Sequence, residues 1–418
     1  MLIHSASQLL TLKGGPRRGS RLADLEIIPD GAVLLRDGII EKVGESATLL
    51  AAYPGEPLLD ASGSVVMPGF VDPHTHLVWA GDRCNEFEMR IQGKTYMEIM
   101  NAGGGINATV RVTRSTPLEK LVEENLPRAI NHFSHGVTTV EVKTGYGLDT
   151  ASEIKQLEVI AALNHSGPIE IVPTFMGAHA VPPEFHGDTN AFTETICIEM
   201  IPAVKAWSLK NLPALPFVDI FCEENVFNLE HSRRILEYAR QHGFPLKIHA
   251  DEFGNIGGAG LAVELGAASA DHLVKISAAE IEKLAASDTV AVSLPCTPFG
   301  LADPHYTPAR QIIDSGGLLA VASDMNPGPA WCENFQFVLA LACRYLNLTP
   351  AEAVAAATIN AAAAILRADR VGSLEPGKQA DLLILNVSDY RHLGYRFGGN
   401  LVKTVIKKGE VFPVSSLR

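Results

Sequence analysis

Cysteine is scarce in this chain, and its few positions are scattered. The 418 residues include six cysteines, and no two of them form a Cys-X-X-Cys pair. This usage is typical of reduced, mostly buried thiols in a cytoplasmic protein. The six positions are Cys84, Cys197, Cys222, Cys296, Cys332 and Cys343.

Long apolar runs and a surplus of basic residues are also missing. No basic segment followed by an apolar one opens the chain, and no apolar stretch reaches the length of a membrane span. Lysine and arginine number 34 against 47 aspartates and glutamates, which gives a formal net charge of −13. We therefore expect a soluble, cytoplasmic protein without a nucleic-acid or membrane partner. A small anionic substrate is still allowed, because one arginine inside a cleft can outweigh the overall charge.

Both ends of the chain are rich in short apolar strands and turns. Residues 31–43 contain the turn Asp37-Gly38 between two apolar runs, which predicts an antiparallel hairpin. Similar strand patterns return at residues 380–386 and 402–412. We expect residues 1–65 and 367–418 to form one small β-sandwich domain, built from both chain ends. Residues 66–366 are expected to form a separate, larger domain.

The middle of the chain alternates apolar strands with helical stretches rich in Ala, Leu and Glu. Strands are expected at residues 65–76, 136–142, 170–176, 217–222, 245–249, 268–272, 289–294 and 318–323. Helices are expected between them, for example at residues 115–134, 150–164, 229–242, 256–265, 277–286 and 308–315. This alternation predicts the α/β class and a (β/α)8 TIM-like barrel. An open, doubly wound sheet is the alternative, but no Gly-X-Gly-X-X-Gly turn follows the first strand.

Polar residues that suit a metal follow the ends of several predicted strands. His74 and His76 end the first strand, and residues i and i+2 of a strand point to the same face. The fifth strand ends at His249, three residues before Glu252, and the sixth ends at His272. Asp324 follows the eighth strand. A barrel gathers its active site at the carboxyl ends of its strands, so the pattern favours a mononuclear metal site with imidazole and carboxylate ligands.

Several motifs identify a family resemblance. The stretch Pro68-Gly69-Phe70-Val71-Asp72-Pro73-His74-Thr75-His76 resembles the opening motif of the amidohydrolase superfamily, the metallo-dependent hydrolases. Residues 372–382 are similar to the segment that returns this family's chain into its β domain. More narrowly, five stretches resemble the imidazolonepropionase family of histidine degradation. They are residues 79–83, 102–106, 143–149, 177–180 and 249–253.

The resemblance implies a ligand set and a reaction. His74, His76, His249 and Asp324 would bind one zinc or iron ion per chain. Related enzymes with two metals carry a bridging lysine after the fourth strand, and the segment 217–224 ends without one. The implied reaction is hydrolysis of the ring amide C–N bond of 4-imidazolone-5-propanoate to N-formimidoyl-L-glutamate. Glu252 would move the proton, with Asp324 sharing this task, and His272 would orient the carbonyl oxygen.

The resemblance also implies how an anionic heterocyclic substrate is held. Arg83 is the candidate for the propionate, because a guanidinium matches a carboxylate with two parallel hydrogen bonds. The other predicted substrate contacts are Tyr146, His179, Glu252, Asn326, Gly328 and Pro329. Pro329 stands where the family has a small hydroxyl residue, and residues 296–299 also depart from the family pattern. A homodimer is expected, as in similar enzymes.

Three other functions fit parts of the same pattern. The departures from the family pattern at Pro329 and residues 296–299 are also compatible with a related cyclic-amide hydrolase. The same ligand set suits a deaminase acting on a heterocycle. A catalytically inactive barrel kept as a scaffold would lack a ligand or the acid–base glutamate, and the sequence lacks neither.

Overall fold

The barrel is an eight-stranded sheet in which each strand pairs in parallel with the next one along the chain. The computed structural model describes residues 1–94, 98 and 103–417, so Ala102 of the motif at 102–106 lies outside the described residues. The sheet order is β15-β14-β13-β12-β11-β10-β9-β8, as predicted for a (β/α)8 barrel. Its strands are β8 (Phe70–Asp72), β9 (Val137–Lys143), β10 (Glu170–Ala178), β11 (Phe217–Cys222), β12 (Lys247–Ala250), β13 (Ser269–His272), β14 (Val290–Ser293) and β15 (Leu319–Val321).

The first and last strands meet just beyond the ends of β8 and β15. Thr75 and Met325 form a parallel bridge, and the amide of His76 donates to the carbonyl of Met325 at 2.8 Å. The amide of Asp324 donates to the carbonyl of His74 at 3.1 Å. These bonds hold two segments with predicted metal ligands side by side, although 250 positions of sequence separate them (324 − 74).

The strand predicted over residues 65–76 is two strands in different sheets, which corrects the prediction. β7 (Val65–Pro68) pairs with β16 and β2 outside the barrel, whereas β8 pairs with β9 inside it. Gly69 lies between them, and a Cβ added there would lie 2.2 Å from Oγ1 of Thr138. The change of sheet therefore needs a residue without a side chain at this point.

Two further sheets pack together beside the barrel. One has the order β5-β4-β1-β6 and the other β18-β17-β16-β7-β2-β3, so the second combines both ends of the chain. Their inner faces share one core, which includes Ile3, Val33, Val66, Leu382 and Ile406. The predicted domain limits at 65/66 and 366/367 stay predictions. The strands are β1 (Leu2–Ala6), β2 (Gln8–Leu10), β3 (Ile27–Ile28), β4 (Gly31–Arg36), β5 (Ile39–Glu45), β6 (Leu58–Asp60), β16 (Leu382–Leu385), β17 (Val402–Lys407) and β18 (Glu410–Pro413).

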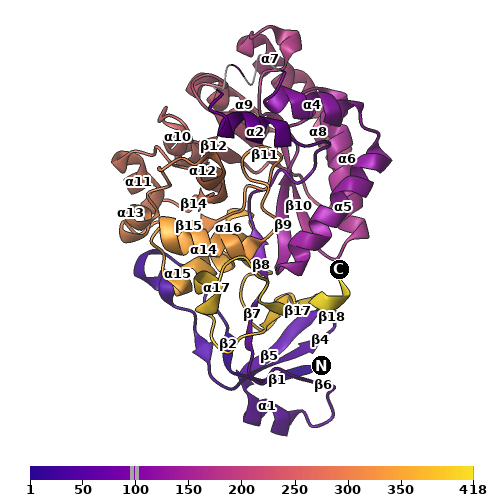
Figure 1. Ribbon diagram of the computed structural model, residues 1–418, viewed down its shortest axis with the longest axis vertical. Helices are drawn as coiled ribbons and strands as arrows, with labels where there is room; N and C mark the ends of the chain where they lie inside the picture. Colours follow the sequence, from indigo (N-terminus) through magenta and orange to yellow (C-terminus); the bar gives the residue numbers. More distant parts are fainter. Residues whose placement is uncertain (95–97, 99–102, 418) are drawn as a thin grey trace.

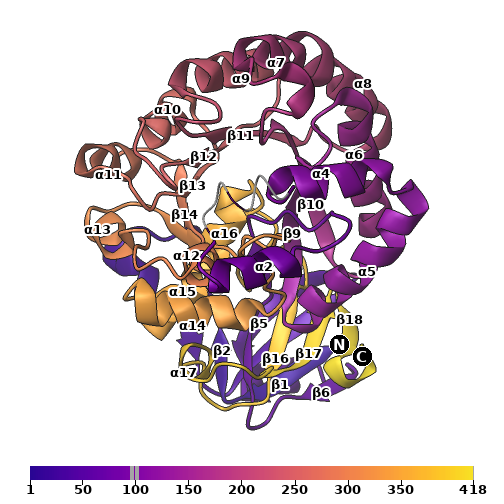
Figure 2. The same cartoon turned by 45° about the horizontal axis from the view of Figure 1, so that its top comes forward.

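Helices form a ring around the barrel strands, and the two smaller sheets lie at one end of the molecule (Figures 1 and 2). The main helices of the ring are α5 (Leu118–Ser134), α6 (Thr150–Ser166), α8 (Ile201–Asn211), α9 (Leu229–Gln241), α10 (Gly258–Leu265), α11 (Ala278–Ala285) and α13 (Ala309–Asp314). α16 (Ile359–Ala364) lies inside the ring and packs against β8, β14 and β15 (Figure 2). The remaining helices are α1 (Ser46–Ala52), α2 (Cys84–Ile91), α4 (Ile106–Ser115), α7 (Thr189–Thr195), α12 (Cys296–Leu301), α14 (Phe335–Tyr345), α15 (Pro350–Ala356) and α17 (His392–Tyr395).

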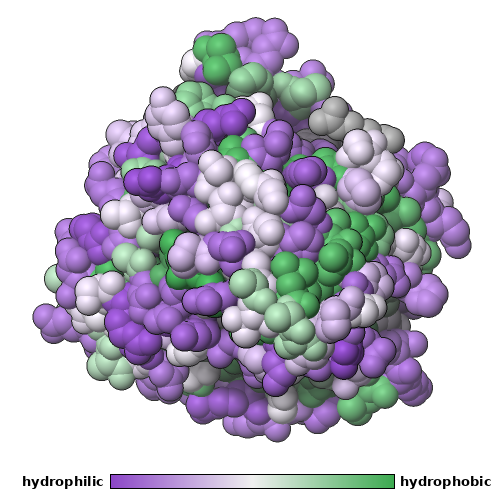
Figure 3. All heavy atoms as spheres, turned by 90° about the horizontal axis from the view of Figure 1, so that it is seen from below, coloured by the Kyte–Doolittle hydropathy of each residue, from purple (hydrophilic) through white to green (hydrophobic). Residues whose placement is uncertain are grey.

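The surface mixes polar and apolar residues. Figure 3 shows hydrophilic residues over most of the visible face, with a hydrophobic area to the right of its centre. Among the described helices, none combines the length and the apolarity that a membrane crossing requires.

Candidate metal centre and active site

Five side chains from four barrel strands form the centre of the site, and we call them the ligand cluster. They follow or end β8, β12, β13 and β15, so the barrel closure brings them together. Two of these residues have left-handed backbone, with φ of +76° at His272 and +53° at Asp324. Such strained backbone is common at functional sites, and here it redirects the chain where each strand ends. The ligand cluster consists of His74, His76, His249, His272 and Asp324.

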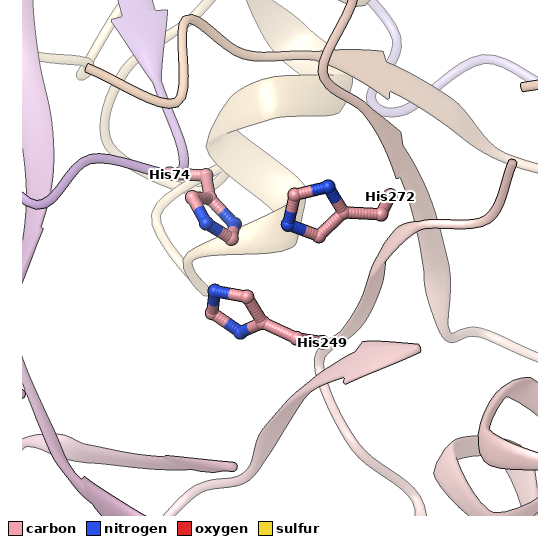
Figure 4. Close-up of side chains that lie close together, drawn as sticks. All are labelled: His74, His249 and His272. Atoms are coloured by element: carbon pink, nitrogen blue, oxygen red, sulfur yellow. The ribbon is translucent and has the colours of Figure 1, made fainter. Parts of the chain in front are cut away.

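The side chains of His74, His249 and His272 point toward one another (Figure 4). One oxygen of Asp324 lies 3.5 Å from Nε2 of His74 and 3.8 Å from Nε2 of His76. The Nε2 atoms of His76 and His249 are 3.4 Å apart. Nitrogen atoms of His74, His249 and His272 also lie within 4.8 Å of one another. The structure thus brings the four predicted ligands together and places His272 beside them.

These positions fit a bound cation. Ligands about 2.1 Å from a tetrahedral ion lie roughly 3.4 Å from each other. Nε2 of His74 is buried and has no hydrogen-bond partner among the described residues. Burial lowers the pKa of His74, His76 and His272 well below the ordinary value, so these imidazoles are neutral, the form that binds metal.

Beneath the ligand cluster lies a set of five fully buried charged residues, which we call the support network. Nδ1 of His74 donates to Asp271 at 2.6 Å, and Nδ1 of His249 lies 3.1 Å from Asp219. Asp271 therefore orients His74 through a hydrogen bond so that its Nε2 faces the centre of the site, and Asp219 lies against the Nδ1 side of His249. The support network consists of Glu141, Lys143, Asp219, Lys247 and Asp271, each 0% exposed.

Two lysines hold these carboxylates in place. Nζ of Lys143 donates to Glu141 at 2.8 Å and to Asp219 at 2.7 Å. Nζ of Lys247 donates to the carbonyl of Pro73 at 3.0 Å and lies 3.5 Å from Asp271. Burial alone would raise the pKa of Asp219, but His249 and Lys143 hold it well below its usual range. Asp219 is therefore held in its ionised form within the network.

Glu252 and Asp324, the predicted proton carriers, lie in contrasting surroundings. An oxygen of Glu252 is 3.6 Å from Nε2 of His272, and burial followed by the charge of Asp324 raises the pKa of Glu252 well above its ordinary value. Glu223 holds the turn by accepting the amides of Glu252 and Phe253 at 2.7 and 3.0 Å. Burial raises the pKa of Asp324 to about 6, although the Thr297 hydroxyl donates to its carboxylate.

Tyr146 and His179 lie on the same side of the ligand cluster. The His179 ring stacks on His76 with centroids 4.7 Å apart, and Nδ1 of His179 pairs with the carbonyl of Gly145 at 3.0 Å. Burial lowers the pKa of His179 to about 3. The buried Tyr146 ring lies 5.9 Å from that of His76. A Cβ added at Gly145, where φ is +109°, would come within 2.7 Å of His179, so this turn requires glycine.

The remaining predicted substrate contacts lie in the loops after β8 and β15. Nε and Nη2 of Arg83 donate to Glu86 at 2.9 and 2.7 Å. The side chain of Asn326 is bonded within its own loop. Its Nδ2 donates to the backbone carbonyl of Asp324, and its Oδ1 accepts from the backbone amide of Gly328, both at 2.7 Å. The backbone carbonyl of Pro329 packs closely against Gly300 of α12. A Cβ added at Gly300 would lie 1.7 Å from the carbonyl oxygen of Pro329.

Sequence reasoning missed the support network, Glu86, Glu223 and Thr297. A signal for the network existed, because charged residues are rare inside strands that are buried on both faces. β9 carries Glu141 and Lys143 within Val-Thr-Thr-Val-Glu-Val-Lys, and β11 carries Asp219 within Phe-Val-Asp-Ile-Phe-Cys. Glu86 lies in an ordinary amphipathic helix, where no local pattern marks it.

Comparisons with known proteins agree with this geometry. The model of the amidohydrolase family matches residues 65–412, and that of the bacterial imidazolonepropionase-like composite domain matches residues 31–55. The imidazolonepropionase of Herpetosiphon aurantiacus is 50% identical over 98% of this chain and 96% of that protein. The imidazolonepropionase of Chloroflexus aggregans is 48% identical over 98% of each chain.

Solved structures support the fold alone. Guanine deaminase of E. coli matches with a TM-score of 0.73 at 15% identity, over 99% of this chain and 98% of that one. A zinc-bound adenosine deaminase of Xanthomonas campestris matches with a TM-score of 0.68 at 19% identity, over 100% of this chain and 95% of that one. The family model and the full-length relatives show that the chain belongs to the amidohydrolase family and, within it, to the imidazolonepropionases.

Proposed function

We propose that this enzyme hydrolyses the ring amide C–N bond of 4-imidazolone-5-propanoate and releases N-formimidoyl-L-glutamate. One observation carries the proposal: Glu252, a largely enclosed glutamate with a raised pKa, lies 3.6 Å from His272 at the edge of the ligand cluster. This places a proton carrier beside a cation site, as ring-amide hydrolysis requires. The identity of about half the residues with imidazolonepropionases favours this reaction over deamination of a heterocycle.

His74, His76, His249 and Asp324 would hold one ion. A zinc or iron ion bound there would act as a Lewis acid and lower the pKa of an adjacent water molecule. Asp271 and Asp219 contribute by fixing the Nδ1 sides of His74 and His249. The narrower assignments, zinc or iron, one ion per chain, a homodimer and a cytoplasmic location, stay predictions.

The chain's own residues move the proton. Glu252 takes a proton from the attacking water and gives it to the ring nitrogen as the C–N bond breaks, which its raised pKa favours. Asp324 can share the first transfer, because its pKa of about 6 lies close to neutral pH. His272, neutral through burial, donates a hydrogen bond to the carbonyl oxygen as negative charge builds there.

The loops around the ligand cluster bind the rest of the substrate. Arg83 attracts the propionate, while Tyr146 and His179 contact the ring from the side of β9 and β10. Gly328 keeps the approach to Arg83 open, since a Cβ there would lie 2.9 Å from Nη1. Asn326 and Pro329 contribute through the loop that carries Gly328.

A turnover assay with freshly prepared 4-imidazolone-5-propanoate tests the proposal. N-formimidoyl-L-glutamate should form without ammonia, and Glu252→Gln should reduce kcat by about a hundredfold or more. Ammonia release would indicate a deaminase instead. Absence of turnover with metal-loaded enzyme would overturn the proposal.

A further inference from the structure

Glu86 is a buried carboxylate in the first turn of α2, and the proposed chemistry does not use it. It is 7% exposed and has two different tasks for its two oxygens. Oε2 accepts both Nε and Nη2 of Arg83, at 2.9 and 2.7 Å. Oε1 accepts the amide of Gly105 at 2.9 Å, just before α4 begins. Glu86 therefore links Arg83 to the segment that precedes α4.

This pairing decides which part of Arg83 remains for a ligand. A carboxylate can bind a guanidinium in a fork at the Nε–Nη2 edge or at the Nη1–Nη2 edge, and Glu86 takes the first. Nη1 is left free of Glu86, and a Cβ added at Gly328 would lie 2.9 Å from it. The charge of Arg83 also reaches the Tyr146 hydroxyl, whose pKa it lowers against the larger raising effect of burial. Nη1 thus lies beside Gly328 of the loop after β15, and the guanidinium lies close enough to Tyr146 of the loop after β9 to act on its hydroxyl.

We propose that Glu86 is a positioning residue for substrate recognition. By occupying Nε and one N–H of Nη2, it fixes the guanidinium so that the substrate carboxylate is bound on the Nη1 side and not at the Nε–Nη2 edge. This inference rests on the proposed function, because it takes the ligand of Arg83 to be the propionate. It adds that affinity for the propionate depends on a second, protein carboxylate.

Glu86→Gln tests this directly. A carboxamide can accept from Arg83 or from Gly105 but not from both, because its NH2 group would face an N–H donor. KM should rise about tenfold while kcat stays within about twofold, since the propionate is remote from the bond that breaks. The matched control is Glu88→Gln, an exposed glutamate of the same helix, which should leave KM unchanged.

A double-mutant cycle separates positioning from general support of the fold. In an Arg83→Gln background, Glu86→Gln should have no further effect on KM. For the uncharged propanamide analogue of the substrate, Glu86→Gln and the wild type should react alike. Equal losses in both backgrounds, or with the uncharged analogue, would show a merely structural role and overturn the inference. A lower or unchanged KM would mean that Glu86 competes with the substrate or does not matter, and would also overturn it.

Binding of imidazole-4-propanoate, which has the side chain but no ring carbonyl, gives a readout without turnover. Calorimetry should show an about tenfold weaker Kd for Glu86→Gln and no change for Glu88→Gln. If Glu86→Gln weakens binding of this analogue but the wild type does not open the imidazolone ring, the proposed reaction fails while the role of Glu86 stands. If the ring opens but Glu86→Gln leaves Kd unaffected, the proposed reaction stands and the role of Glu86 fails.

Discussion

Two polar clusters at opposite ends of the barrel strands differ in how completely their atoms are paired. The ligand cluster leaves three ring nitrogens without hydrogen-bond partners among the described residues, namely Nε2 of His74, Nδ1 of His76 and Nδ1 of His249. The other cluster, which we call the seam cluster, lies between the start of β10 and the smaller sheets. It consists of Glu170, Gln379, Asp381 and Lys407.

The polar side-chain atoms of the seam cluster are bonded to one another. Nζ of Lys407 donates to Asp381 at 2.7 Å and to Glu170 at 3.2 Å. Nε2 of Gln379 donates to the same two carboxylates at 2.8 and 2.9 Å. A saturated buried cluster stabilises the fold, whereas unpaired buried nitrogens in a converging set imply a missing partner. The difference in pairing therefore separates a structural cluster from a functional one.

Removing a ligand should give the largest difference between the clusters. His249→Ala takes one imidazole from the ligand cluster, and turnover should fall by at least about a thousandfold together with the metal content per chain. Metal analysis and the turnover assay measure both. His305→Ala, an exposed histidine paired with Asp303, should change neither. A His249→Ala enzyme that retains its metal would contradict the ligand assignment.

Exchanging the two buried lysines for methionine sharpens the comparison. Lys143→Met and Lys407→Met each leave carboxylates without their cation, so each should lower the free energy of unfolding by about 3–5 kcal/mol. Only Lys143→Met should also weaken metal binding, because Lys143 holds the carboxylate beside His249. Denaturant titration and metal titration give the two quantities. Equal losses of metal affinity would erase the distinction between the clusters.

The sequence predicts the positions of the ligand cluster better than its pairing. Alternation of apolar strands and helices predicted the barrel, and strand ends predicted where His249 and Asp324 lie. It did not predict that Gly69 divides the first strand between two sheets, because the reason is a contact with Thr138, which is distant in sequence. The bond of Lys143 to Asp219 and that of Gly105 to Glu86 were missed for the same reason.

The support network and the seam cluster offer a matched pair of aspartates. Asp271→Asn replaces the acceptor of His74 Nδ1, and metal affinity should fall by about 10–100-fold. Asp381→Asn makes the same change in the seam cluster and should leave metal affinity unchanged. Titration of the metal-free proteins with zinc measures both. If Asp271→Asn binds zinc as tightly as the wild type, the network supports the fold and not the ion.

The smallest expected effect is the pH response of the seam cluster. Burial raises the pKa of Glu170, but Lys407, Gln379 and Arg370 together outweigh it and bring the pKa to about 2. Because the folded protein binds this proton more weakly than the unfolded chain, the stabilisation is complete above the ordinary pKa of a glutamate. It is lost as the pH falls from there toward 2.

Glu170→Gln should therefore cost about 1–2 kcal/mol near neutral pH, after allowance for solvent screening, and the difference from the wild type should vanish near pH 2. Denaturant titrations of the metal-free proteins across this range measure it without a contribution from ion loss. Glu224→Gln, an exposed glutamate, should show no such window. If the difference in the free energy of unfolding between Glu170→Gln and the wild type stays constant with pH, Glu170 acts through its hydrogen bonds and not through its charge. The seam cluster would then not be held together by ion pairs.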